Sequence, residues 1–205
     1  DLQALEKELQ KGDVCAVIFE PIQGVGGLDM PEDDFVLKME QLCQQYDTAL
    51  IADEVQSGFS RSGTFFAFQN NNIKPHVITM AKGMGNGFPI GGILVHPDVK
   101  PKYGMLGTTF GGNHLACSAS LAVLEIIKKD KLQQHAKEME SYFRSKAEKI
   151  KGAKIKGRGL MLGLEFDFEV GPLRKKLIYE KHIFTGGSSK KNVLRILPPL
   201  TVQKV

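Results

Sequence analysis

Cysteine is scarce in this sequence of 205 residues. Its three cysteines, Cys15, Cys43 and Cys117, are far apart and odd in number. No C-x-x-C pair occurs, so the spacing favours neither a zinc site nor a disulfide framework. Cys15 and Cys117 lie in apolar stretches, and we expect both to be small core residues in a reducing, cytoplasmic compartment.

Long hydrophobic runs are also absent. No apolar run reaches the roughly 18 residues that a membrane span needs. No signal peptide opens the chain and no N-x-S/T sequon occurs, so we expect no membrane partner. The chain begins in a helix-like segment and stops soon after Pro198-Pro199-Leu200, and we expect it to be part of a longer protein.

Charge of either sign is moderate. Lys and Arg number 27 against 23 Asp and Glu, which gives a formal net charge of +4 in a chain that is 42% hydrophobic. These values exclude a mainly disordered chain. The lysines are spread among Glu and Gln on helical stretches and are not clustered with aromatic residues. We interpret them as solvated helix faces and expect no nucleic-acid partner.

Several sequence motifs of nucleotide, metal and hydrolase sites are missing. There is no G-x-x-x-x-G-K-[ST] loop, no H-E-x-x-H and no G-x-S-x-G elbow. The Gly-rich turns at 24–27 and 83–87 follow apolar runs, but neither has G-x-G-x-x-G opening a helix, so dinucleotide binding is weakly supported. The five histidines do not pair at ligand spacing, and we expect no metal site.

Short apolar runs alternate with stretches of helical periodicity in the first half of the chain. The runs are rich in β-branched side chains, which is typical of strands buried on both faces. This alternation predicts an α/β unit with a mainly parallel sheet. The expected strands are 14–19, 49–52, 77–80 and 90–95, and the expected helices are 1–11 and 31–46.

The pattern changes after residue 112. Residues 115–127 are small or aliphatic nearly all round, which predicts a largely buried helix, and the apolar residues that follow step by three or four. We expect a long connecting helix over 113–150 and a smaller α+β domain over 151–205. The expected elements of that domain are two strands within 155–168, a helix over 172–181 and a strand over 193–197.

Ionisable residues stand where the apolar runs end. Glu20, the pair Asp53-Glu54 and Lys82 each follow a predicted strand, and ligands of parallel sheets bind at the carboxyl ends of strands. A lysine that is partly desolvated there is a nucleophile for carbonyl groups, and a buried aspartate can hold a protonated ring nitrogen. This pair suits a pyridoxal phosphate enzyme. From spacing alone, a structural ion pair or a solvent-facing lysine remains the alternative.

Four longer strings carry a resemblance. They are Glu20–Gly24 (E-P-I-Q-G), Asp53–Gly63 (D-E-V-Q-S-G-F-S-R-S-G), Ala81–Gly91 (A-K-G-M-G-N-G-F-P-I-G) and Thr108–Asn113 (T-T-F-G-G-N). Together, and in this order, they resemble the class III aminotransferases, which are pyridoxal-phosphate-dependent enzymes of fold type I. The nearest resemblance is to the acetylornithine/ornithine aminotransferase branch. It implies that residues 1–112 are part of the large cofactor-binding domain and 151–205 part of the small one.

The resemblance implies a cofactor site, residue by residue. Lys82 would form the Schiff base with pyridoxal 5′-phosphate and shuttle the proton of the reaction. Asp53, with Glu54 beside it, would keep the pyridine nitrogen protonated, so that the ring acts as an electron sink. Val55 would pack against one face of the ring, and Gln56 would lie near its 3-hydroxyl oxygen.

The resemblance also implies a substrate site and a homodimer with shared active sites. Thr109 would donate to the cofactor phosphate, usually across the dimer interface, and Thr108 would touch cofactor or substrate. Arg195, in the string R-I-L-P-P-L, matches the arginine that binds a substrate α-carboxylate. A guanidinium suits this task because it grips a carboxylate with two parallel hydrogen bonds.

Transamination is the activity that the resemblance implies. The terminal amino group of an ornithine-type donor, N-acetylornithine or a related N-acylornithine, would pass to a 2-oxo acid acceptor, 2-oxoglutarate, in arginine or ornithine metabolism. Ornithine or other ω-amino acid aminotransferases, aminomutases and decarboxylases share Lys82 and Asp53 and remain alternatives, as does an inactive fragment. A non-catalytic α/β module, in which Lys82 is only structural, is the alternative of a different class.

Two departures from the family pattern bear on this interpretation. Ornithine-type enzymes commonly carry a second glutamate, in E-P-I-Q-G-E, that can pair with the substrate-binding arginine. Here that position is Val25, which leaves the identity of the amine donor open. The chain also looks like the C-terminal half to two-thirds of a family member. We therefore expect the family's N-terminal phosphate-binding loop and ring-stacking aromatic residue to lie outside this sequence.

Overall fold

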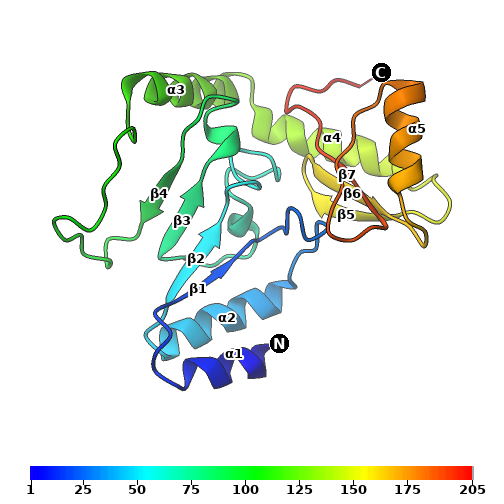
Figure 1. The fold of residues 1–205 in the computed structure, drawn as a ribbon. Coiled ribbons are helices and arrows are strands. Elements are labelled where there is room, and N and C mark those ends of the chain that lie inside the picture. The colour runs from blue at the N-terminus through cyan, green and yellow to red at the C-terminus, as the bar shows by residue number, and fades with distance from the viewer. Residues whose placement is uncertain (205) are drawn as a thin grey trace.

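Two sheets organise residues 1–204, the part of the chain that the computed structural model describes (Figure 1). The larger sheet has the order β1-β2-β3-β4, and the smaller sheet has the order β5-β6-β7. The expected mainly parallel sheet is confirmed, because β1, β2 and β3 are parallel and only β4 runs antiparallel to its neighbour β3. The strands are β1 Ala16–Phe19, β2 Ala49–Asp53, β3 Val77–Met80, β4 Gly92–Val95, β5 Lys154–Arg158, β6 Met161–Glu165 and β7 Val193–Ile196.

Local signals set where the helices begin. The Asp1 side chain caps the first helix by accepting from the backbone N–H of Gln3 at 2.9 Å. Asp33 and Asp34 stand in the first turn of the second helix, where negative charge is favourable. No helix within residues 1–204 is long and apolar enough to cross a membrane. The helices are α1 Leu2–Leu9, α2 Asp33–Gln45, α3 His114–Lys129, α4 Leu132–Ala147 and α5 Gly171–Lys181, with short 3-10 helices η1 Ala67–Asn70 and η2 Lys82–Met84.

The core of the α/β unit lies between α2 and the larger sheet. α2 packs against β2, and α1 packs against α2 at the same end of the molecule (Figure 1). This arrangement buries the apolar face that the spacing in residues 31–46 predicts. The buried residues of this core are Val36, Met39, Cys43, Leu50 and Ile73.

Several expected core positions are exposed. The prediction that Cys15 and Cys117 are core residues is wrong, since both are exposed and only Cys43 is buried. Ile18 of β1 is 61% exposed, so this strand is not covered on both faces. The expected burial of α3 is also wrong, because Leu115 and Leu121 face solvent. In each case the described part of the chain places no element over the apolar face.

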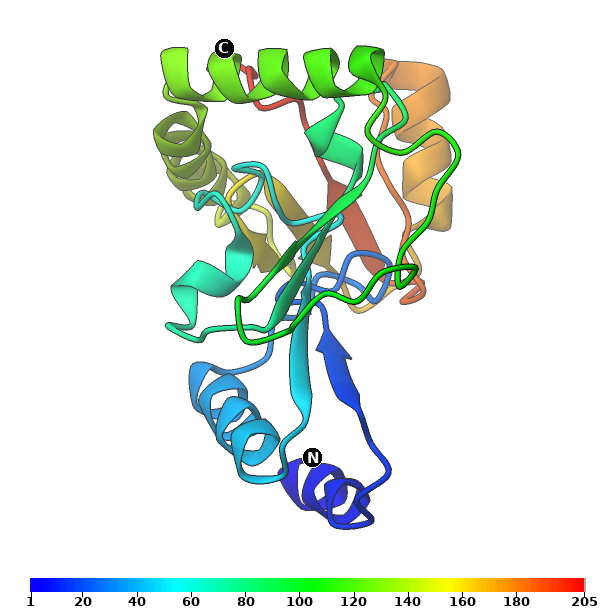
Figure 2. The same cartoon turned by 90° about the vertical axis from the view of Figure 1, so that its left-hand side faces the viewer.

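The connecting segment 113–150, expected to be a long helical stretch, consists of two helices, α3 and α4. Asn113 caps α3 by accepting from the Ala116 backbone N–H at 3.0 Å. The chain turns between α3 and α4 at Lys131, which has the left-handed φ of 51°. α3 lies at the end of the molecule opposite α1 and α2, and α4 leads from it to the smaller sheet (Figures 1 and 2).

The smaller sheet is antiparallel and joins the α/β unit through a close backbone contact. β6 lies in its centre, between β5 and β7. In the turn between β5 and β6, a Cβ on Gly159 would lie 2.4 Å from the carbonyl carbon of Ser62, so only glycine fits there. The next residue, Leu160, donates its backbone N–H to the Arg61 carbonyl at 2.8 Å. The loop after β2 and the β5–β6 turn therefore pack backbone to backbone.

Candidate active site

Asp53 lies at the carboxyl end of β2, and one of its two carboxylate oxygens accepts hydrogen bonds from the protein. Its Oδ1 accepts from the backbone N–H of Val55 at 3.0 Å and from Oγ1 of Thr79 at 3.1 Å. Thr79 is its register partner on β3. Both donors reach Oδ1, so Oδ2 is left to accept a hydrogen bond from a ligand. The carboxylate is thus oriented by the sheet before any ligand binds.

Glu54, next in the chain, is turned into the protein. Its side chain is 1% exposed, and its oxygens accept from Ser57 Oγ at 2.6 Å and from the Phe68 backbone N–H at 2.8 Å. Burial raises the pKa of Glu54, while these hydrogen bonds act in the opposite direction. Both carboxylate oxygens therefore hold the loop between β2 and η1. This anchoring role accounts for Glu54 without a contact to a cofactor.

Lys82 follows β3 at the same edge of the sheet, where η2 begins. Its φ of 45° is a left-handed conformation that costs a non-glycine residue roughly 1 kcal/mol. The expectation of partial desolvation is wrong for the described chain, since Lys82 is exposed. Its position at the strand end, next to that of Asp53, is the one the sequence predicts.

A cavity of about 400 Å³ opens beside Lys82. Gln56 and Arg61 from the loop after β2 line it, and Phe59, Ile127 and Leu200 give it apolar wall. This volume is in the range of cavities that hold small molecules, about 300–1,000 Å³. The cavity brings together the loop after β2, η2, both connecting helices and the segment after β7.

Arg195 of β7 and Gln56 both contact Gly24, in the loop after β1. Arg195 Nη1 donates to the Gly24 carbonyl at 3.0 Å. A Cβ on Gly24 would lie 1.9 Å from Gln56 Oε1, so the side chain of Gln56 needs a glycine there. Gln56, expected near the cofactor, and Arg195, expected at the substrate carboxylate, therefore both contact Gly24.

The Arg195 guanidinium keeps part of its donor capacity. Its Nε is buried and has no hydrogen-bond partner within residues 1–204. Its bond to the loop after β1 goes to the neutral carbonyl of Gly24. Val25, the next residue in that loop, is 63% exposed and supplies no carboxylate. The guanidinium charge is therefore not neutralised by a carboxylate of the described residues.

Thr108 and Thr109 are not brought to the other expected site residues. Both are exposed in the segment between β4 and α3, which runs along the outside of the molecule (Figure 2). Thr108 Oγ1 accepts from the Gly111 backbone N–H at 3.1 Å, a contact within its own turn. Val55 is half-buried beside Asp53.

Arg61 is a site residue that the sequence analysis passed over. Its guanidinium lines the cavity and donates to the backbone carbonyls of Leu160 and Pro198. Burial lowers the pKa of Arg61 from its ordinary value. The signal that could have found it is its place in the string Asp53–Gly63, where an arginine sits among small residues.

Known proteins share both the sequence and the fold. A family model described as "Aminotransferase class-III" matches residues 1–205. The chain is 42% identical to an acetylornithine aminotransferase of Aquifex aeolicus, over 100% of this chain and 54% of the relative. An ornithine aminotransferase from Toxoplasma gondii superposes with a TM-score of 0.91 at 31% identity, covering 100% of this chain and 51% of that one. A taurine:2-oxoglutarate aminotransferase from Bifidobacterium kashiwanohense, in complex with PLP and glutamate, has a TM-score of 0.87 at 29% identity and covers 98% and 51%.

Fold and site together define an α/β protein of the fold-type-I pyridoxal phosphate class. The chain belongs to the class III aminotransferase family, and the resemblance found in its four strings is confirmed. The cofactor of this family is pyridoxal 5′-phosphate. The residues present fit that cofactor, since Asp53 offers Oδ2 to a protonated ring nitrogen and Lys82 borders a cavity at the same sheet edge. The chain spans about half the length of the curated relatives it matches.

Proposed function

We propose that the whole protein is an aminotransferase that moves the terminal amino group of an ornithine-type donor to 2-oxoglutarate. N-acetylornithine or a related N-acylornithine is the donor that we favour. The observation that carries the proposal is that an oriented aspartate, Asp53, and Lys82 stand at the carboxyl ends of adjacent parallel strands. The relatives named acetylornithine aminotransferase support this choice of donor.

The cofactor, when bound, supplies an electron sink for the bonds at the amine-bearing carbon. In the proposed site Asp53 would accept a hydrogen bond from the ring nitrogen, and Thr79 and Val55 hold its carboxylate in place. Lys82 Nζ would act as the base that takes the proton from the amine-bearing carbon of the substrate and as the acid that gives it up again. Arg195 holds a carboxylate of the substrate through its remaining N–H groups.

Ornithine itself is the second candidate donor. Relatives and solved structures named ornithine aminotransferase occur beside the acetylornithine enzymes. Val25 leaves Arg195 without a carboxylate partner at that position, so this feature does not select between the two donors. An aminomutase or a decarboxylase would use the same Lys82 and Asp53, and dependence on 2-oxoglutarate separates them from a transaminase.

The same proposal includes a homodimer in the cytoplasm. Thr109 would reach the cofactor phosphate of a second subunit, and Thr108 would lie beside it. The exposed position of both threonines supports this arrangement. Sedimentation of the full-length protein tests whether it is a dimer. Loss of cofactor in the Thr109→Ala variant tests the contact that we propose for Thr109.

Borohydride reduction of the cofactor-loaded, full-length protein, followed by peptide mass mapping, tests the assignment of Lys82. We expect a phosphopyridoxyl group on Lys82, none at that site in Lys82→Ala, and wild-type labelling in the control Lys100→Ala on the exposed segment after β4. Lys82→Ala should also abolish transamination. Labelling elsewhere, or turnover retained in Lys82→Ala, contradicts the proposal. Rates with N-acetylornithine and with ornithine then identify the donor.

A further inference from the structure

The loop that contacts Arg195 is closed on itself. The backbone N–H of Gln23 donates to the Asp29 carbonyl at 2.9 Å, and that of Leu28 donates to the Gln23 carbonyl at 2.8 Å. Leu28 is buried at the base of this loop. Residues 23–29, which we call the β1 loop, therefore behave as one small unit. The position of this unit depends on the residues that contact its outer side.

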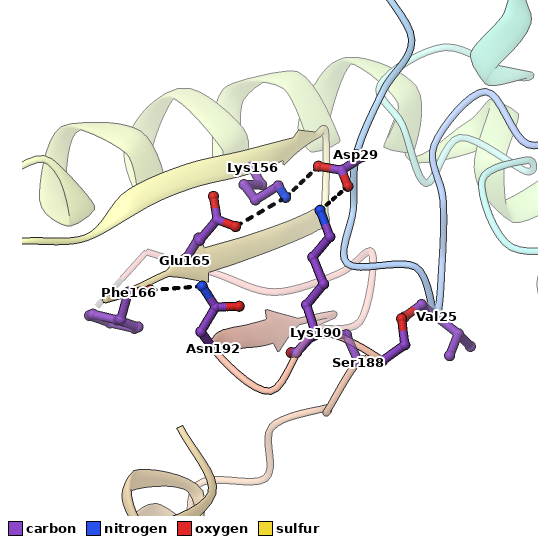
Figure 3. Close-up of polar contacts among 9 residues, drawn as sticks. Val25, Asp29, Lys156, Glu165, Phe166, Ser188, Lys190 and Asn192 are labelled. Atoms are coloured by element: carbon purple, nitrogen blue, oxygen red, sulfur yellow. Dashed lines mark hydrogen bonds and ion pairs between the residues drawn. The ribbon is translucent and has the colours of Figure 1, made fainter. Parts of the chain in front are cut away.

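Two lysines of the small domain hold the Asp29 side chain. Lys156 of β5 and Lys190, in the segment before β7, both pair with the Asp29 carboxylate, one at each oxygen (Figure 3). The Lys156 side chain is only 9% exposed, and its ammonium also lies 3.6 Å from Glu165. A buried ammonium needs its carboxylate partners, so Asp29 is fixed against the smaller sheet.

The segment before β7 holds the β1 loop at two further points. Ser189 donates to the Val25 carbonyl through its backbone N–H at 2.8 Å and through Oγ at 3.1 Å. The aliphatic stem of Lys190 lies against Gly27, where an added Cβ would be 3.0 Å from its Cδ. Val25, Gly27 and Asp29 are thus all held from one side, by one stretch of the small domain.

Gly24 lies within this held loop, and its carbonyl is the acceptor for Arg195 Nη1. A single bond to a neutral carbonyl fixes the direction of the guanidinium without neutralising its charge. No described residue supplies a carboxylate to this guanidinium, so its charge is left for a ligand. Displacing the β1 loop would remove this guide from Arg195 while leaving β7 itself paired to β6.

We propose that Asp29 is a positioning residue of the substrate site: with Lys156 and Lys190 it holds the β1 loop so that the Gly24 carbonyl orients Arg195 for a dicarboxylate substrate. The inference rests on the proposed function, in which Arg195 binds a substrate carboxylate. Asp29 itself touches no substrate in this arrangement. It acts through the loop and the arginine.

Glutarate, a dicarboxylate without an amine, is the probe for the test. Its dissociation constant is measured by titration calorimetry on the full-length, cofactor-loaded protein. We expect Lys190→Gln and Asp29→Asn to weaken glutarate binding about tenfold, the scale of a lost charge-assisted contact. Lys190→Arg, which keeps charge and reach, should restore wild-type binding. Glu169→Gln, which breaks the exposed pair with Lys191 at 3.4 Å, is the matched control and should change nothing.

A second readout separates positioning from general damage. With L-glutamate as amino donor, the two variants should raise KM about tenfold and leave kcat within about twofold. Wild-type glutarate binding in Lys190→Gln, a fall in kcat alone, or an equal loss in Glu169→Gln would overturn the inference, as would absence of glutarate binding by the wild type. Labelling of Lys82 by borohydride reports on the proposed function separately, because it does not depend on Asp29.

Discussion

Thr79 Oγ1 donates to Asp53 Oδ1 at 3.1 Å, across the boundary between β3 and β2. The two residues are direct partners in the register of these parallel strands, so the hydrogen bond is a product of the sheet. Together with the Val55 N–H it occupies Oδ1 and so restricts rotation of the carboxylate. The aspartate that we propose for the cofactor's ring nitrogen thus depends on a neighbouring strand as well as on its own.

Thr79→Val should weaken binding of pyridoxal phosphate to the full-length protein. Valine keeps the shape of threonine and removes the hydroxyl, so Asp53 loses one of the two donors that orient it. We expect the dissociation constant for the cofactor to rise about tenfold, as for loss of one hydrogen bond to a charged group. Absorbance titration measures it, and Thr79→Ser, which keeps the hydroxyl, should behave as the wild type. Unchanged affinity in Thr79→Val would mean that the Val55 N–H suffices.

Glu54→Ala should destabilise the protein more than Glu54→Gln. Alanine leaves the Phe68 N–H and the Ser57 hydroxyl without their acceptor in a buried place, at about 1–3 kcal/mol for each unpaired group. Glutamine keeps an acceptor oxygen. Denaturant unfolding measures the difference, and equal losses in the two variants would show that the loop does not need this acceptor.

The same Glu54→Gln variant should also change the pH dependence of stability. Burial raises the pKa of Glu54 in the folded protein, so the folded state holds its proton more tightly than the unfolded chain. The stability from this group is fully present below the unfolded pKa, about 4.3. It is lost as the pH rises through the raised folded value. The difference in unfolding free energy between wild type and Glu54→Gln should follow that course.

Asp29→Asn should have the opposite pH signature. Burial alone would raise the pKa of Asp29, but the hydrogen bonds from Lys156 and Lys190 outweigh it and lower the pKa. The stability that Asp29 contributes is therefore present above its unfolded pKa, about 3.9, and is lost as the pH falls through the folded value. Melting temperatures of wild type and Asp29→Asn should differ at pH 7 and converge in acid. A difference that persists at low pH would assign it to packing.

Gly159→Ala should destabilise the protein well beyond Gly152→Ala. Both glycines have a left-handed φ, 62° and 79°, so both substitutions carry the conformational cost of about 1 kcal/mol. Nothing lies within 4 Å of a Cβ on Gly152, whereas a Cβ on Gly159 would meet the backbone of Arg61, Ser62 and Gly63. The excess loss in Gly159→Ala, seen in the unfolding free energy, measures the close approach of the two units. Equal losses would mean that the backbones can move apart.

Elements with strong local signals could be predicted from the sequence. The strands within 14–19, 49–52 and 77–80 form as expected, and Asp53 and Lys82 stand at their carboxyl ends. These features follow from short apolar runs and from the polar residues that end them. The strand within 90–95 was also expected, but its antiparallel direction was not, because a run of apolar residues carries no information on strand direction.

Features set by distant contacts could not be predicted. Exposure of Cys15, of α3 and of Lys82 depends on which elements cover them, and local periodicity does not report that. The ion pair between Asp29 and Lys190 could not be predicted because Lys190 lies 161 residues further along the chain. Similarly, spacing offers no sign that Gln56 and Arg195 meet at Gly24.

The hydrogen bond between Arg195 and Gly24 spans 171 residues of sequence. A contact of such separation forms at a large cost in loop-closure entropy unless the intervening chain is already ordered. During synthesis the β1 loop leaves the ribosome long before Ser189, Lys190 and Arg195 exist. Connectivity therefore limits the order of events: the sheet edge with Asp53 and Lys82 can form first, and the guanidinium can find its direction only after residues 189–195 have been made.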